Sequence, residues 1–269
     1  MTMARAWQDL AWTDLAGDAP KRIAILPIAA IEQHGPHLPL GVDALINQAI
    51  LARALLKLPD AIPACTLPMQ VIGHSVEHTR FPGTLTASAE TLIALWTSIG
   101  HSVARAGITK LILFNTHGGN PPISEIVCRR LRDEAGMLAV SCFAGRLGLP
   151  DGLTISAAER KHGYHGGLIE TSIMLAIRPD LVRMDRAEDF RSAWIDRATD
   201  NMVLEPEGVT QIGWLTQDLH PSGALGDASA ATADFGERLL DHAAARLGAL
   251  IADVHRLDPG TFLRPGPLG

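Results

Sequence analysis

The most informative stretch of the sequence is Ile31-Glu32-Gln33-His34-Gly35-Pro36-His37-Leu38-Pro39-Leu40-Gly41-Val42-Asp43, which follows the apolar run Ile23-Ala24-Ile25-Leu26. The apolar run predicts a buried strand over residues 22–26. If residues 31–34 are extended, alternate side chains share a face, so Glu32 and His34 point the same way. A carboxylate oxygen and an imidazole nitrogen that converge suit a divalent transition metal. Asp43 falls where a helix begins, and its carboxylate is free to face back toward this motif.

Strand and helix patterns alternate on both sides of this motif. Strands are predicted at 22–26, 65–72, 110–114 and 138–143, and helices at 43–57, 88–105, after 121, at 170–177 and at 229–254. Pro68 weakens the second strand and suits a sheet edge or an early end. The alternation predicts an α/β fold in which helices cover both faces of a mostly parallel sheet. No internal repeat or linker divides the chain, so we expect one domain over residues 1–269.

A second polar motif follows the third predicted strand and reads Asn115-Thr116-His117-Gly118-Gly119-Asn120-Pro121. Both motifs therefore lie at carboxyl ends of parallel strands, where α/β proteins bind ligands. The two glycines admit two interpretations: an anion-binding nest at a helix N-terminus, or close passage of the backbone beneath a metal held by His117. Nucleotide binding is the weaker choice, because the sequence has neither P-loop spacing nor a GxGxxG motif.

Composition excludes several classes of function. The chain has 269 residues, a net charge of −6 and no basic run, so no nucleic-acid partner is expected. It shows no signal peptide and no apolar run long enough to span a bilayer. Its three cysteines lack CxxC spacing, which argues against a disulfide framework or a cysteine zinc site and favours the cytoplasm.

Metal-activated water is the strongest chemical hypothesis. No G-x-S-x-G elbow occurs, and no cysteine lies in a comparable loop. Two divalent ions that share a hydroxide and one bridging carboxylate can polarise a substrate carbonyl. A histidine away from the metals then suits the transfer of a proton to the leaving nitrogen.

With these motifs in place, the sequence resembles the creatininase (creatinine amidohydrolase) family. The resemblance rests on Leu26 to Leu40 with Asp43, and on three further motifs, Phe81-Pro82-Gly83-Thr84, Asn115 to Asn120 and His165-Gly166-Gly167-Leu168-Ile169-Glu170-Thr171-Ser172. It implies a three-layer α/β/α fold, a hexameric homo-oligomer, and a centre of two divalent metal ions (zinc, manganese or iron). The implied activity is hydrolysis of a C–N bond in a small cyclic amide or formamide.

Residue roles follow from the same resemblance. Glu32 and His117 match ligands of one metal, His34 matches a ligand of the other, and Asp43 matches the bridge. His165 matches the family's proton-transfer histidine. Creatininase itself has a further glutamate ligand where this chain has Gly119, and we expect Glu170 to fill that gap and to join His165 in the catalytic group.

Other assignments concern the substrate. We expect His78, Gly118, Gly119, Trp194 and Trp214 to contact it, although buried packing explains the tryptophans equally well. His37 and His78 also suit hydrogen bonds that pin loops. Residues 186–225 lack clean periodicity and are interpreted as a lid or an oligomer contact. Three alternatives stay open: another creatininase-family activity (cyclic keto-sugar or lactone hydrolysis, or peptide trimming), a single-metal hydrolase, and a non-catalytic anion-binding module.

Overall fold

The computed structural model describes residues 5–17, 19–197, 203–264 and 266, and its centre is a five-stranded sheet. The strands are β1 (Arg5–Ala6), β2 (Ile23–Ile28), β3 (Ala64–Thr66), β4 (Lys110–Asn115) and β5 (Leu138–Phe143). They are ordered β1-β3-β2-β4-β5, and every neighbouring pair is parallel. The predicted parallel sheet is therefore confirmed.

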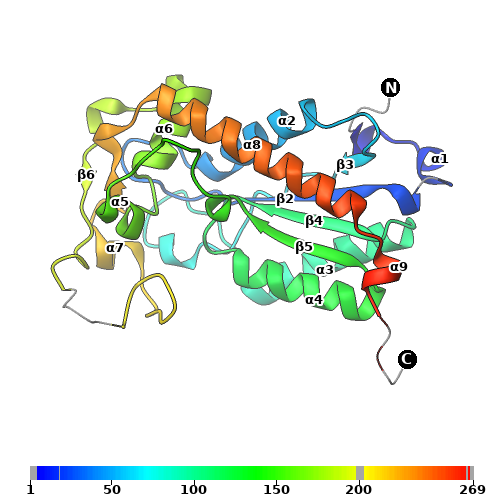
Figure 1. Ribbon diagram of the computed structural model, residues 1–269. Helices are drawn as coiled ribbons and strands as arrows, with labels where there is room; N and C mark the ends of the chain where they lie inside the picture. The colour runs from blue at the N-terminus through cyan, green and yellow to red at the C-terminus, as the bar shows by residue number, and fades with distance from the viewer. Residues whose placement is uncertain (1–4, 18, 198–202, 265, 267–269) are drawn as a thin grey trace.

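Five long helices cover the two faces of this sheet. They are α2 (Val42–Leu56), α3 (Ala89–Arg105), α4 (Pro121–Ala135), α6 (Leu168–Ile177) and α8 (Ala233–Arg256). Figure 1 shows α2, α6 and α8 on one side of the sheet and α3 and α4 on the other. The three-layer α/β/α arrangement predicted from the sequence is confirmed.

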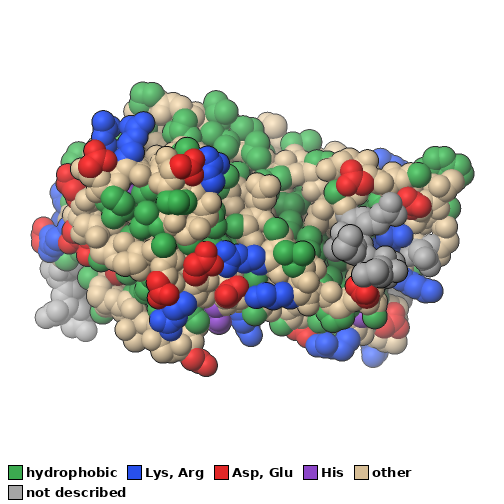
Figure 2. Space-filling view, turned by 90° about the horizontal axis from the view of Figure 1, so that it is seen from above, with side chains coloured by type: hydrophobic (Ala, Val, Ile, Leu, Met, Phe, Trp, Pro, Cys, Tyr) green, Lys and Arg blue, Asp and Glu red, His purple; other side chains and the backbone are tan. Residues whose placement is uncertain are grey.

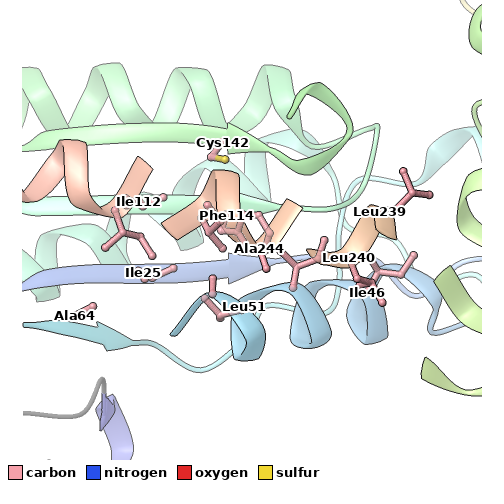
Figure 3. Packing of buried hydrophobic residues seen from close by; sticks show 14 of the residues in the cluster. Ile25, Ile46, Leu51, Ala64, Ile112, Phe114, Cys142, Leu239, Leu240 and Ala244 are labelled. Atoms are coloured by element: carbon pink, nitrogen blue, oxygen red, sulfur yellow. The ribbon is translucent and has the colours of Figure 1, made fainter. Parts of the chain in front are cut away.

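The alternation of side chains along the strands produces two separate hydrophobic cores. Ile23 and Ile25 of β2 pack with α2, α6 and α8, as do Ile112 and Phe114 of β4. Figure 3 shows Ile25, Ile112 and Phe114 within this core. The intervening strand residues face α3 and α4, where Trp96 is fully buried. A strand buried on both faces must be apolar throughout, which explains why these segments are continuous hydrophobic runs rather than alternating ones.

The second predicted strand departs from expectation in two ways. β3 ends at Thr66, two residues before Pro68, so the early end is confirmed. The edge position is wrong, because β1 pairs with β3 through Arg5↔Cys65 and Ala6↔Thr66. A two-residue strand has too few residues for a period-2 pattern, which is why the sequence did not reveal β1.

Shorter elements complete the described part of the chain. The short helices are α1 (Trp12–Leu15), α5 (Ala157–His162), α7 (Thr216–Leu219) and α9 (Pro259–Phe262), and β6 (Asp189–Phe190) pairs with β7 (Gly226–Asp227) in an antiparallel ladder. Single 3-10 turns are η1 (Trp7–Asp9), η2 (Ala19–Lys21), η3 (Val76–His78), η4 (Ala144–Arg146), η5 (Pro179–Leu181), η6 (Met184–Arg186) and η7 (Ala228–Ala230). α5, α7 and β6 gather at the end of the molecule toward which the strands run (Figure 1).

Residues 186–225, interpreted from the sequence as a lid or oligomer contact, contain only β6, α7 and irregular structure where they are described. Residues 198–202 of this segment lie outside the described residues. Phe190 is 1% exposed and packs with Ala224 and Ala228, so this part of the segment is integrated into the fold. Its role as a lid or contact stays a prediction.

The surface agrees with the charge pattern of the sequence. On the face drawn in Figure 2, acidic and basic side chains are interspersed among apolar and neutral ones. Among the described residues, no helix is long and apolar enough to cross a membrane.

Candidate metal centre

Four chain segments deliver the predicted site residues to the carboxyl end of the sheet. Glu32 and His34 follow β2, Asp43 lies in the first turn of α2, and His117 follows β4. His165 and Glu170 come from the loop before α6 and from its first turn. The side chains at most 3% exposed are those of Glu32, His34, Asp43 and His117. The structure therefore brings these proposed ligands into one buried cluster.

Asp43 lies between the two histidines of the cluster. Its Oδ1 atom is 3.8 Å from His34 Nε2. Its Oδ2 atom is 3.5 Å from His117 Nδ1. Because each carboxylate oxygen faces a different imidazole, the residue is placed as a carboxylate that bridges two ions would be.

Glu32 and Glu170 complete the two halves of the cluster. Glu32 Oε1 lies 3.2 Å from His117 Nδ1. Glu170 Oε1 lies 3.9 Å from His34 Nε2. His34, Asp43 and Glu170 form one set of donor atoms that lie within 4.8 Å of one another and could hold a metal ion. Glu170 thus lies on the His34 side of the cluster, and its role as a ligand stays a prediction.

The backbone orients both histidines for this geometry. His34 Nδ1 lies 3.0 Å from the Glu32 carbonyl oxygen, and His117 Nε2 lies 2.8 Å from the His74 carbonyl oxygen. A proton donated to each carbonyl leaves His34 Nε2 and His117 Nδ1 with lone pairs that face Asp43.

Three buried acceptors in the cluster have no hydrogen-bond partner among the described residues: Glu32 Oε2, His34 Nε2 and Asp43 Oδ2. Polar atoms buried without partners cost free energy, and native proteins rarely leave them so. Carboxylate oxygens and imidazole nitrogens are also a usual donor set for zinc, manganese and iron. The residues present therefore fit a divalent metal centre.

Three asparagines hold the two strand ends in register. Asn47 Nδ2 donates to the carbonyl groups of Ile28 and Phe114, which lie at or next to the ends of neighbouring strands. Asn115 binds the backbone of His117 from both sides, donating to its carbonyl oxygen and accepting from its N–H. Asn120 precedes α4 at the position where a side chain can cap a helix, but it instead binds Asn115, Ala29 and His74. Its side chain therefore holds the loop in place and does not cap the helix. Sequence spacing alone does not distinguish these two roles.

His165 lies beside the cluster with its ring stacked between two other imidazoles. Its ring centroid is 4.3 Å from that of His34 and 4.1 Å from that of His78. Nε2 lies 2.7 Å from the Gln33 carbonyl oxygen, so a proton on Nε2 leaves Nδ1 as the acceptor, 3.8 Å from Glu32 Oε1. Burial, together with His78 and His34, holds the pKa of His165 well below its ordinary value. This imidazole is therefore neutral, and its Nδ1 atom carries a lone pair.

His78 approaches the same oxygen of Glu32 as His165 does. Its Nε2 atom is 3.4 Å from Glu32 Oε1. Nδ1 lies 2.7 Å from the Gln33 amide nitrogen and 2.8 Å from the Thr216 hydroxyl. His78 thus ties the 73–84 loop to the motif and to α7. His37 Nε2 lies 2.9 Å from Thr171 Oγ1, a hydrogen bond that links the motif to α6.

The structure explains why this chain carries glycine at position 119. A Cβ atom there would lie 2.2 Å from the His74 carbonyl oxygen and 2.6 Å from His117 Nε2. No side chain fits at this position. Glu77 Oε1 lies 3.1 Å from the same Cβ position and 3.8 Å from His117 Nε2. Sequence reasoning missed Glu77, because only the fold brings its loop against His117.

The other residues expected to contact the substrate differ in how exposed they are. Gly118 is exposed beside His117. Trp194 is 8% exposed and packs with Leu219, Leu225 and Trp214 in a small hydrophobic cluster. Leu225 in turn pairs with the backbone of His165. The two tryptophans therefore pack behind the His165 segment, and their contact with a substrate stays a prediction.

Mutual electrostatic interactions set the charges in the cluster without metal. Burial alone would lower the pKa of each histidine. The neighbouring carboxylates outweigh this effect and raise the pKa of His34 to about 9 and the pKa of His117 to about 10. Burial and Glu32 raise the pKa of Asp43. Burial likewise raises the pKa of Glu170 to about 7. A metal ion would take the place of the histidine protons, so its binding competes with protonation.

Known proteins are similar to this chain over most of its length. The family model described as creatinine amidohydrolase matches residues 8–251. The mycofactocin precursor peptide peptidase of Mycobacterium ulcerans (strain Agy99) is 31% identical over 244 residues, covering 88% of this chain and 86% of that protein. The creatinine amidohydrolase of Pseudomonas putida is 31% identical over 203 residues, covering 70% and 75%. The solved structure of a manganese creatininase superposes with a TM-score of 0.74 at 26% identity, covering 94% of this chain and 100% of that one.

Proposed function

Since this chain belongs to the creatininase family and is a metal-dependent hydrolase of C–N bonds, we propose that it cleaves an amide at a centre of two divalent ions. Glu32 and His117 would hold one ion, and His34 and Glu170 the other. Asp43 would bridge them. The observation that carries this proposal is that the two oxygens of Asp43 face different histidines.

When bound, the two ions would lower the pKa of a water molecule and polarise the substrate carbonyl. The protein supplies the rest. His165 Nδ1 accepts the proton of the attacking water and delivers it to the leaving nitrogen. The Gln33 carbonyl oxygen holds the other side of the His165 ring, which keeps Nδ1 directed toward the cluster.

The proposed substrate is a small cyclic amide or a formamide. Carboxylates dominate the surroundings of His117, since Glu32 Oε1, Asp43 Oδ2 and Glu77 Oε1 all lie within 4 Å of its ring nitrogens. Such surroundings repel a phosphate or carboxylate ligand. They disfavour the alternative of an anion-binding module at Gly118 and Gly119.

A peptide is the second candidate substrate. An open cavity of about 320 Å³ lies against Gln33, whose side chain contacts both His165 and His78, and its other lining residues are Gly35, Pro36, Leu40, Phe81, Pro82 and Ser222. The mostly apolar wall suits the side chain of a peptide residue next to the scissile bond. The peptidase of Mycobacterium ulcerans, similar over most of the chain, makes this candidate worth testing beside the small amides.

Metal analysis combined with substrate profiling tests the proposal. Protein purified without chelator should contain about two equivalents of zinc, manganese or iron per chain, as a two-metal site requires. Activity should be measured against creatinine, formamides, cyclic imides, lactones and short peptides, then after chelation, and again after metal is restored. One equivalent at full activity would establish a single-metal hydrolase, and hydrolysis by metal-free protein would contradict the proposal.

Glu170→Gln should weaken the binding of one of the two ions. Glutamine keeps the shape of the side chain but removes the negative charge that faces His34, so we expect at least about a 10-fold loss of affinity at this position. Isothermal titration with Zn²⁺, before and after dialysis, measures it. Glu90→Gln is the matched control, because Glu90 is an exposed glutamate in the first turn of α3. Unchanged zinc binding would show that Glu170 only orients its neighbours.

A further inference from the structure

Glu159 is a buried carboxylate of α5 that lies outside the motifs of the proposed centre. It is 7% exposed. Its Oε1 atom accepts the N–H of Leu168 at 2.9 Å, and its Oε2 atom accepts the N–H of Asp227 at 2.8 Å. One side chain therefore joins two segments that are about sixty residues apart in the sequence. Leu168 is the first residue of α6, where an anion also interacts favourably with the helix dipole.

Three glycines make room for this carboxylate. A Cβ atom at Gly163 would lie 2.3 Å from Glu159 Cδ, and one at Gly167 would lie 2.7 Å from Oε1. A Cβ atom at Gly226 would also lie 2.7 Å from Oε1. Any side chain at these positions would displace a group that two backbone N–H donors hold in place.

The two joined segments are those that hold the proposed proton-transfer histidine. His165 and Leu225 form an antiparallel backbone pair, in which the Leu225 N–H donates to the His165 carbonyl at 2.6 Å. The N–H of Gly166 donates to Glu170 Oε2 at 2.5 Å. The loop that Glu159 anchors thus fixes both His165 and Glu170.

We propose that Glu159 is a positioning residue, whose carboxylate fixes residues 165–170 against residues 225–227 and so orients His165 and Glu170 toward the metal centre. The inference rests on the proposed function, because the metal ions give that orientation its purpose. Glu159 itself does not touch the cluster residues and acts through the backbone of the two segments.

Glu159→Gln tests this inference with Zn²⁺ alone as the probe. Glutamine offers one acceptor oxygen, and its NH₂ group would oppose the second backbone N–H. We expect the first zinc ion to bind as in the wild type and the second to bind about 10- to 100-fold more weakly, as when an orienting partner of a ligand is lost. If the variant binds each of the two zinc ions as tightly as the wild type does, the inference is overturned.

The wild-type titration separates this inference from the proposed function. If the wild type binds fewer than two zinc ions, the two-metal proposal itself fails. Ser156→Ala is the control for a simple loss of helix stability, because Ser156 Oγ accepts the Glu159 N–H and caps the same helix. This variant should melt at a lower temperature and keep both zinc affinities.

A double-mutant cycle with Gly163→Ala supplies the second test. Gly163 has an ordinary φ of −95°, so alanine there acts mainly by colliding with the Glu159 carboxylate. Gly163→Ala should reproduce the weaker second zinc site. In a Glu159→Ala background the collision partner is gone. Gly163→Ala should then weaken the second zinc site by less than about a further 2-fold. Losses that simply add would show that the two residues act independently, against the inference.

Discussion

Asp43→Asn should deprive the protein of both metal ions and lower kcat/KM by about 10³-fold or more. The asparagine keeps the size of the side chain but loses the charge and one of the two acceptor oxygens that face His34 and His117. A group on which both halves of a catalytic centre depend has an effect as large as the loss of the whole centre. The change is measured as metal content and as the rate at which the variant hydrolyses the compound that the wild-type protein cleaves.

The thermal stability of Asp43→Asn should fall below that of the wild type only when metal is present. Burial and Glu32 raise the pKa of Asp43 in the folded protein, so its charge destabilises the metal-free fold at neutral pH. The neutral asparagine should therefore leave the metal-free Tm unchanged or higher. With metal present, the wild type gains about 2.7 kcal/mol at a hundred-fold excess over Kd, and the variant should not.

Asp234→Asn is the matched control, since Asp234 is an exposed aspartate in the first turn of α8. It should keep both metal ions and full activity, with a Tm within a degree or two of the wild type. An Asp43→Asn protein that still holds two ions would contradict the bridging role.

His165→Gln should lower kcat by about 10²- to 10⁴-fold while both metal ions stay bound, because only proton transfer is lost. The glutamine is polar and similar in size, yet it cannot take up and release a proton near neutral pH. KM should change little, because the proposed role of His165 is proton transfer rather than binding of the substrate. Steady-state kinetics and metal analysis of the same preparation separate the two effects.

Metal loss in His165→Gln would point to a different role. Glu32, His34 and His165 also form a set of donor atoms within 4.8 Å of one another, so His165 would then be a ligand. His242→Gln serves as control, because His242 is a partly buried histidine of α8 that binds the Leu147 carbonyl outside the cluster. It should leave metal content and kcat unchanged.

Local sequence was sufficient for the main strands and the long helices, and the family resemblance supplied the proposed ligands. Continuous apolar runs and helical stripes identified β2, β4, β5 and the long helices, because these patterns arise from burial of neighbouring residues. Strand ends in a parallel sheet share one edge, so the motifs around Glu32 and His117 were expected to meet there. Their side chains do lie within hydrogen-bonding and ion-pair distance. The edge strand β1 escaped prediction because two residues carry no pattern.

What the sequence by itself determined is therefore the order of layers and the types of side chain at the strand ends, since both follow from short-range spacing. Only the tertiary structure decided which atoms meet. The His74 carbonyl fills the space at Gly119, and Glu77 comes to lie beside His117. Glu159 reaches Asp227 in the same way. These contacts join segments tens of residues apart, and the packing of the whole chain, not any local periodicity, sets such distances.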